Sequence, residues 1–151
     1  NEGVQTSNSG DSHQFKFISR AILAGYTASN VDVRTSGYDC IIDYKDILYK
    51  IQVKGRGVTS ENSISFKGRA RGGQGIDHKH KTNQGKRITH EDCDIYASVD
   101  KGTGICYLIP MKWVDEKIPP NKSDEHKDKI HLDELEEFKE NWNVFEEKKY
   151  F

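Results

Sequence analysis

The stretch YDCIIDYKDILYKIQVK, residues 38–54, alternates apolar and polar side chains with the two-residue period of a β-strand. We predict two antiparallel strands, Tyr38–Tyr44 and Ile47–Lys54, joined by a two-residue turn at Lys45-Asp46. The rest of the chain is interpreted outward from this hairpin.

The two faces of this hairpin have different chemistry. Counting outward from the turn places Asp39 opposite Gln52, with Cβ atoms about 5 Å apart. Because side chains alternate, Lys50, Gln52 and Lys54 share a face with Asp39, so an acid, an amide and an ammonium group meet at the strand ends. The alternative is an ordinary amphipathic hairpin with a polar outer face. The opposite, apolar face is expected in the core and carries Cys40, Ile42, Tyr44, Ile47, Tyr49, Ile51 and Val53.

A helix is predicted over 11–24, after a flexible N-terminal arm at residues 1–10 that consists mainly of small and polar residues. Gln14 falls on the stripe that this helix should bury against the sheet. A buried amide needs a hydrogen-bond partner, so we expect Gln14 to approach the pair of Asp39 and Gln52. The alternative is that Gln14 lies at a frayed first turn, where a polar residue costs little.

The remaining pattern predicts a mixed sheet flanked by helices. Its α/β (α+β) architecture would be a single domain over 11–151, with a loop insertion at about 55–91. Further strands are predicted at 31–34, 94–99 and 105–110, and a closing helix at 132–145.

Charge is distributed unevenly along the 151 residues, although the net charge is only −1. Residues 50–91 hold ten Lys and Arg against three acids, whereas 111–151 hold eight Lys against twelve acids. A local basic excess favours a polyanionic partner, and a solvated basic loop is the alternative. No membrane-spanning run is evident, and three cysteines without metal-site spacing favour a reducing cytoplasm.

The basic segment combines cations with amides and glycines, which suits contact with double-stranded DNA. Lys and Arg bind phosphates, whereas Arg can pair with guanine and Gln with adenine at base edges. The alternative is a loop that binds phosphates without reading sequence. The predicted DNA-binding residues are Lys50, Arg56, Lys67, Arg69, Arg71, Gln74, Lys79, Lys81, Lys86 and Arg87.

Asp39 followed by Gln52-Val53-Lys54 across a hairpin resembles the motif of the PD-(D/E)xK nucleases. The likeness extends from Gly10 to about Phe145 and is greatest to the group I intron homing endonucleases, which use a PD-(D/Q)xK version of the motif. Tyr38 replaces the usual proline. Gln14 stands where the first helix of these enzymes commonly carries a glutamate, which leads to the hypothesis that it is a Glu-to-Gln change that leaves bound DNA uncut.

The resemblance implies a restriction-endonuclease-like core and a site-specific, Mg²⁺-dependent endonuclease for double-stranded DNA. Asp39 and the Val53 backbone carbonyl would bind Mg²⁺, Lys54 would act on the attacking water, and Gln52 would occupy the place of the second acid. Gln14 would complete the catalytic set. Cutting both strands requires two sites, which implies a homo-oligomer, a dimer or a tetramer. The expected location is the cytoplasm, with a bacterial or phage-encoded chain.

Two alternatives stay open from the sequence. One keeps the fold but changes the substrate, to a Holliday-junction resolvase or a restriction-type nuclease. The other is a catalytically inactive DNA-binding protein, which the two glutamines at usually acidic positions favour.

Overall fold

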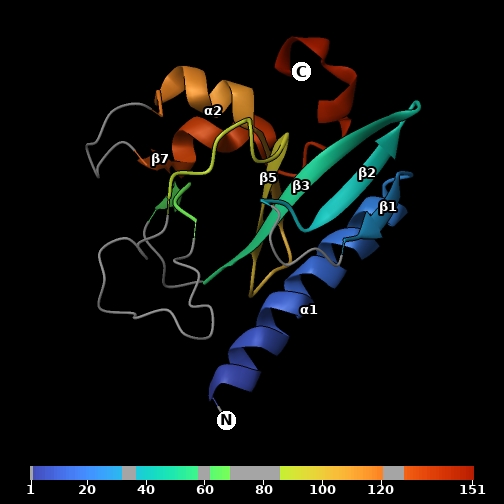
Figure 1. The fold of residues 1–151 in the computed structure, drawn as a ribbon, viewed down its shortest axis with the longest axis vertical. Coiled ribbons are helices and arrows are strands. Elements are labelled where there is room, and N and C mark those ends of the chain that lie inside the picture. Colours follow the sequence, from blue (N-terminus) through green and yellow to red (C-terminus); the bar gives the residue numbers. More distant parts are fainter. Residues whose placement is uncertain (1, 32–36, 58–61, 69–85, 121–127) are drawn as a thin grey trace.

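A computed structural model of the protein describes residues 2–31, 37–57, 62–68, 86–120 and 128–151, with side chains from residue 12 onward. A five-stranded mixed sheet forms its centre, in the order β1-β2-β3-β5-β6 (Figure 1). β3 and β5 run parallel, and the other neighbouring strands are antiparallel. The strands are β1 (Thr27–Asn30), β2 (Cys40–Tyr44), β3 (Ile47–Arg56), β5 (Ile95–Asp100) and β6 (Cys106–Pro110).

The central hairpin forms as predicted from the alternation of its side chains. Lys45 and Asp46 have φ values of 51° and 66°, which is the left-handed conformation that a tight two-residue hairpin turn requires. Register follows the prediction from Tyr44–Ile47 to Cys40–Ile51. The predicted core face is buried except near the turn, where Ile47 is 55% exposed.

Helix α1 spans Glu2–Leu23 and begins earlier than predicted. Residues 2–10, which were predicted as a separate N-terminal arm, continue this helix. Once a helix has nucleated, each added residue contributes another backbone hydrogen bond, so a polar segment can extend it. Gly25, at φ 97°, ends the turn that follows.

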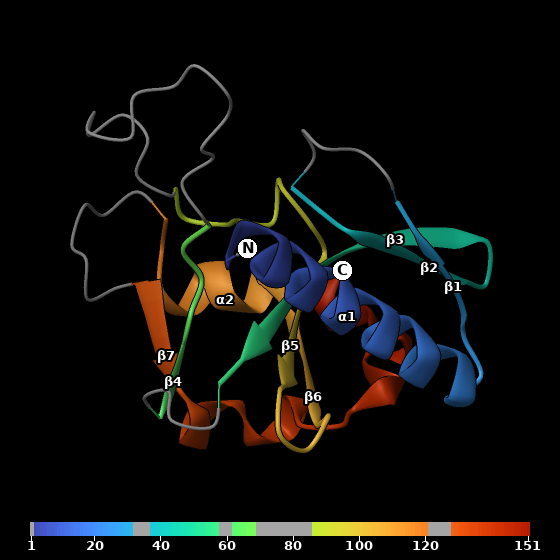
Figure 2. The same cartoon turned by 90° about the horizontal axis from the view of Figure 1, so that it is seen from below.

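α1 packs across one face of the main sheet (Figure 2). Phe17 and Ala21 are fully buried on its inner side. His13 lies over Gly55 so closely that a Cβ atom on this glycine would be 2.2 Å from the His13 Cδ2 atom. This close approach brings the helix to the residue that directly follows Lys54.

The second half of the chain departs most from the prediction. The single closing helix over 132–145 is wrong, because the chain forms short 3-10 helices instead: η3 (Leu132–Phe138), η4 (Trp142–Glu146) and η5 (Lys148–Tyr150). Glu140, with φ 53°, separates the first two. The apolar spacing of three and four residues fits a 3-10 repeat as well as an α-helical one, so the pattern did not distinguish them.

Three further elements complete the fold. α2 (Met111–Lys117), which the sequence did not predict, follows β6 directly. β4 (Ser63–Ser65) pairs with β7 (Lys129–His131) in a small second sheet, which both views place across the molecule from β1 (Figures 1 and 2). The strand before the hairpin is β1 at Thr27–Asn30. The strand predicted at 31–34 falls mostly outside the described part, which does not include residues 32–34.

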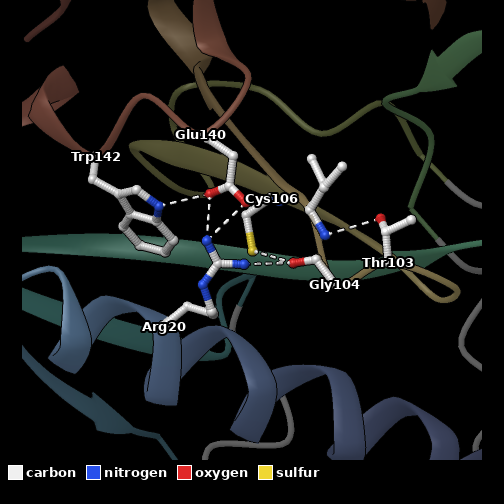
Figure 3. Close-up of polar contacts among 7 residues, drawn as sticks. Arg20, Thr103, Gly104, Cys106, Glu140 and Trp142 are labelled. Carbon is white, nitrogen blue, oxygen red and sulfur yellow. Dashed lines mark hydrogen bonds and ion pairs between the residues drawn. The ribbon is translucent and has the colours of Figure 1, made fainter.

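A polar cluster fastens α1 to the C-terminal segment (Figure 3). One Arg20 nitrogen lies 2.8 Å from both carboxylate oxygens of Glu140, and the other donates to the Gly104 carbonyl at 3.0 Å. The Trp142 indole nitrogen donates to Glu140 at 2.8 Å. Phe17 stacks on Trp142, so polar and aromatic contacts together fix the helix position. None of the helices within the described residues is long and apolar enough to cross a membrane.

Candidate active site

The carboxylate of Asp39 joins the two central strands at the end farthest from the turn. Its Oδ2 atom accepts a hydrogen bond from the Gln52 side-chain amide at 2.9 Å and another from the Val53 backbone N–H at 3.0 Å. The structure therefore brings Asp39 and Gln52 together, as the sequence predicted. The amide of Gln52 uses its nitrogen for this contact, which leaves its oxygen available for another partner.

The backbone at Asp39 departs from regular pairing. The Asp39 N–H donates to the carbonyl of Ile51 at 2.8 Å, although Cys40 is the residue that pairs with Ile51. Asp39 and Cys40 thus both oppose Ile51, which is the pattern of a β-bulge. The bulge moves Asp39 out of the predicted register opposite Gln52 and aims its carboxylate at the Val53 backbone. Bulges of this kind commonly re-aim a side chain next to a functional site.

Lys54 lies next on the same face of β3 as Gln52. Its ammonium group donates to the Lys67 carbonyl at 2.8 Å, so it links the sheet to the segment beyond β4. Burial raises the pKa of Asp39, and the Val53 N–H and the positive charge of Lys54 oppose this rise. Asp39 and Lys54 are thus electrostatic neighbours in a partly desolvated site.

The oxygen atoms around Asp39 suit a hard divalent cation. In a strand, the N–H and C=O of one residue face the same neighbour. Because the Val53 N–H binds Asp39, the Val53 carbonyl faces the same side. Mg²⁺ is commonly held by one or two carboxylates, with water and substrate phosphate as further ligands. No three His, Cys, Asp or Glu side chains gather around a metal-sized space in the described part of the chain, so such an ion would depend on these mixed oxygen ligands.

Gln14 is partly buried on α1. Its neighbour His13 packs on Gly55, which places this part of the helix near the end of β3 that carries Lys54. The structure gives Gln14 no hydrogen bond to any described residue, Asp39 and Gln52 included. Its participation in the site therefore stays a prediction.

Half of the predicted DNA-binding residues fall in the described chain. Lys50 is exposed, with its ammonium 5.3 Å from the centre of the Tyr38 ring. Lys67 pairs with Arg87 in a backbone bridge at the base of the loop, and Lys86 beside them is exposed. Arg56 lies 3.8 Å from Asp100. Arg69, Arg71, Gln74, Lys79 and Lys81 lie outside the described residues.

Arg87 differs from the other predicted DNA contacts because its side chain is only 9% exposed. Its guanidinium forms an ion pair with Asp115 at 3.0 Å and donates to the Ile118 carbonyl. His90 also contacts Asp115, at 2.7 Å. These contacts attach the end of the basic loop to α2, so we leave Arg87 out of the DNA surface proposed below.

Sequence reasoning missed two features near the site. Asp94 accepts the Lys50 backbone N–H at 2.8 Å, which supports the outer side of β3. An open depression of about 510 Å³ adjoins Lys54 and includes Lys129 from β7. The sequence carried no signal for the second feature, because it depends on pairing between segments more than sixty residues apart.

Comparison with known proteins agrees with this geometry. No curated protein sequence matches the chain. The solved structure of a bacterial homing endonuclease, I-Ssp6803I, superposes with a TM-score of 0.63 over 95% of each chain at 17% sequence identity, a likeness that concerns the fold. A family model described as PD-(D/E)XK endonuclease matches residues 4–141. The chain therefore belongs to the PD-(D/E)XK endonuclease family.

Proposed function

We propose that the protein is a site-specific endonuclease of the homing type, which hydrolyses phosphodiester bonds of double-stranded DNA with Mg²⁺. The observation that supports this most is the array of Asp39, Gln52 and Lys54 at one end of the hairpin. The carboxylate is held by the Gln52 amide and the Val53 N–H, and the ammonium follows on the same strand. Family membership supports nuclease chemistry, and the fold of the bacterial homing endonuclease supports the narrower proposal.

Each residue has a distinct proposed role. Asp39 and the Val53 carbonyl would hold Mg²⁺, which supplies charge neutralisation at the scissile phosphate. Gln52 orients the Asp39 carboxylate and offers its own oxygen to the site. The Lys54 ammonium orients the attacking water and stabilises the negative charge that develops on phosphorus-bound oxygens. Its hydrogen bond to Lys67 holds it in a fixed position.

The proposed partner is duplex DNA, contacted from the same side. Lys50 and Lys86 are exposed in the described structure. Arg56, which follows Lys54 by two residues, and Lys67 are partly buried. Residues Arg69, Arg71, Gln74, Lys79 and Lys81 extend this basic set in the proposal. Because the described part of one chain holds one such array, cutting both strands would require a homo-oligomer. The three buried free cysteines agree with action in the cytoplasm of a bacterium.

The decisive experiment concerns Gln14. We expect Gln14→Glu to switch on or strongly increase Mg²⁺-dependent cleavage, because it would add a second carboxylate to the proposed catalytic set. The assay incubates parent and variant with a duplex library and with four-way junctions, then sequences the ends. Asn143→Asp, an equal amide-to-acid change at an exposed position, is the control. Equal cleavage by parent and Gln14→Glu would remove this residue from the catalytic set, and preference for junctions would favour a resolvase.

A second function has specific support, namely DNA binding without cleavage. Asp39 is the one carboxylate in the array, since positions 14 and 52 are both glutamine. A binding protein on this fold would bind duplex DNA but release no ends at any Mg²⁺ concentration, even after Gln14→Glu. Metal-dependent cleavage by either form would exclude it.

A further inference from the structure

The open depression next to Lys54 continues the face that carries the candidate site. β3 and β5 are parallel, with Gln52 aligned to Tyr96 and Lys54 aligned to Ser98. Aligned residues of neighbouring strands project from the same side of a sheet. Tyr96 and Ser98 therefore lie on the face of Gln52 and Lys54, and both line the depression. A chain that occupies the candidate site can pass directly into it.

The lining has the chemistry of an anion site. It contains three cations, Lys54, Arg56 and Lys129, and no acid among the described residues that form it. Ser63, Ser65 and Ser98 contribute hydroxyl groups, which donate to phosphate oxygens. Gly55 and Gly57 also line the depression and add no charged group to it. The volume of about 510 Å³ is within the range of pockets that hold a small ligand.

The far wall comes from the C-terminal third of the chain. Lys129 on β7 pairs with Ser65 on β4. This small sheet is well anchored, since Ile64 and Ile130 are 4% and 2% exposed and the Tyr96 hydroxyl donates to the Ser65 carbonyl at 3.3 Å. Although residues 111–151 are acidic overall, the fold thus presents one of their cations to the active face.

We propose that this depression binds a sugar-phosphate unit of the substrate strand, next to the phosphate at Asp39 and Lys54, and that Lys129 is a phosphate-binding residue. The inference rests on the proposed function for the identity of the strand as DNA. Lys129 lies on an exposed position of its strand, so it can meet a phosphate without a change in the fold. It adds to the basic loop a contact from the segment 111–151, which is acidic overall.

The test measures binding rather than cleavage. A mixed-sequence duplex is titrated by fluorescence anisotropy without Mg²⁺ between 50 and 200 mM salt, the range over which phosphate contacts lose affinity. Removing one contact lowers the slope of log K against log salt by about 0.9 and reduces the affinity lost across this range by about 3.5-fold. We expect both changes in Lys129→Gln and in Lys129→Thr, which keeps strand propensity. Lys129→Arg should retain the parent slope.

Lys148→Gln is the matched control, an equal charge change at an exposed lysine outside the depression. A parent-like slope in both neutral Lys129 variants, or an equal fall in Lys148→Gln, would overturn the inference. A smaller slope confined to the neutral Lys129 variants supports the inference. This holds even if no form of the chain cleaves DNA and the proposed nuclease function fails. Conversely, normal cleavage with an unchanged slope would reject this site and leave the proposed function intact.

Discussion

Gly55→Ala should weaken the contact between α1 and the central strand. A Cβ atom at this position would lie 2.2 Å from the His13 Cδ2 atom and 2.4 Å from its Nε2 atom, far inside van der Waals contact. The His13 ring is only 8% exposed, and the helix is also fixed by buried Phe17 and by the ion pair of Arg20, so neither can move freely. Overpacking of this kind lowers the free energy of unfolding by about 1–3 kcal/mol. The loss lies at the lower end of this range if the His13 ring rotates away.

Urea unfolding measures this loss, and thermal unfolding should show a Tm decrease of roughly 2–12 °C. Gly57→Ala is the control, because a Cβ atom there meets nothing within 4 Å. Adding His13→Ala to Gly55→Ala should recover part of the stability, since the clash is with this ring. Equal stability of Gly55→Ala, Gly57→Ala and the parent would refute the close packing of α1 on β3.

Two further predictions concern charged groups. Asp115→Ala should destabilise the fold by about 3–5 kcal/mol in urea unfolding, because it leaves the buried Arg87 guanidinium without its ion-pair partner. Asp133→Ala changes a side chain that is 91% exposed, so it should alter the free energy of unfolding little. A loss of stability in Asp133→Ala as large as that in Asp115→Ala would contradict this account. Burial should place the Asp39 pKa above its usual 3.8, so carboxyl NMR should detect protonation at higher pH than for an ordinary aspartate. Lys54→Met should raise the Asp39 pKa further, and an unchanged Asp39 pKa would show that the two charges do not interact.

The sign of this titration has a consequence for stability. The folded chain holds the Asp39 proton more tightly than the unfolded chain, because burial disfavours the carboxylate. Protonation of this group therefore favours folding below pH 3.8, and the contribution is lost as the pH rises through the folded-state pKa. Desolvation of the ionised Asp39 carboxylate therefore lowers the stability of the folded chain at neutral pH.

The hairpin and its chemistry could be predicted because they depend on local alternation. A period of two places Gln52 and Lys54 on one face whatever packs above them. The bulge at Asp39 could not be predicted, since nothing in the alternation indicates that the residue before Cys40 bonds out of register to Ile51.

The rest depended on contacts between distant segments. The pairing of Ser65 with Lys129 joins two three-residue strands, too short to give a periodic signal. The C-terminal apolar residues Leu135, Phe138 and Phe145 are buried in the core. Their backbone conformation was not predicted, because the reversal at Glu140 depends on its contacts with Arg20 and Trp142.

The hydrogen bond from Lys54 to the Lys67 carbonyl connects the candidate site with the base of the basic loop. At the other end of that loop, Arg87 and His90 attach it to α2 through Asp115. The segment proposed to contact DNA is therefore anchored at both ends to parts of the fold that also position the site. Cleavage at a defined distance from the recognised bases would follow from such anchoring.

The central claim is that Asp39 serves a nuclease site at the open end of the hairpin. The most direct measurement is Mg²⁺-dependent end formation on duplex DNA by Gln14→Glu, alone and combined with Asp39→Asn or Asp43→Asn. Asp43 lies on β2, the strand that follows Asp39, but it is exposed near the turn, so its change is the matched control. We predict that Asp39→Asn abolishes cleavage while DNA binding persists, and that Asp43→Asn cleaves normally. Undiminished cleavage by the Asp39→Asn form would contradict the account.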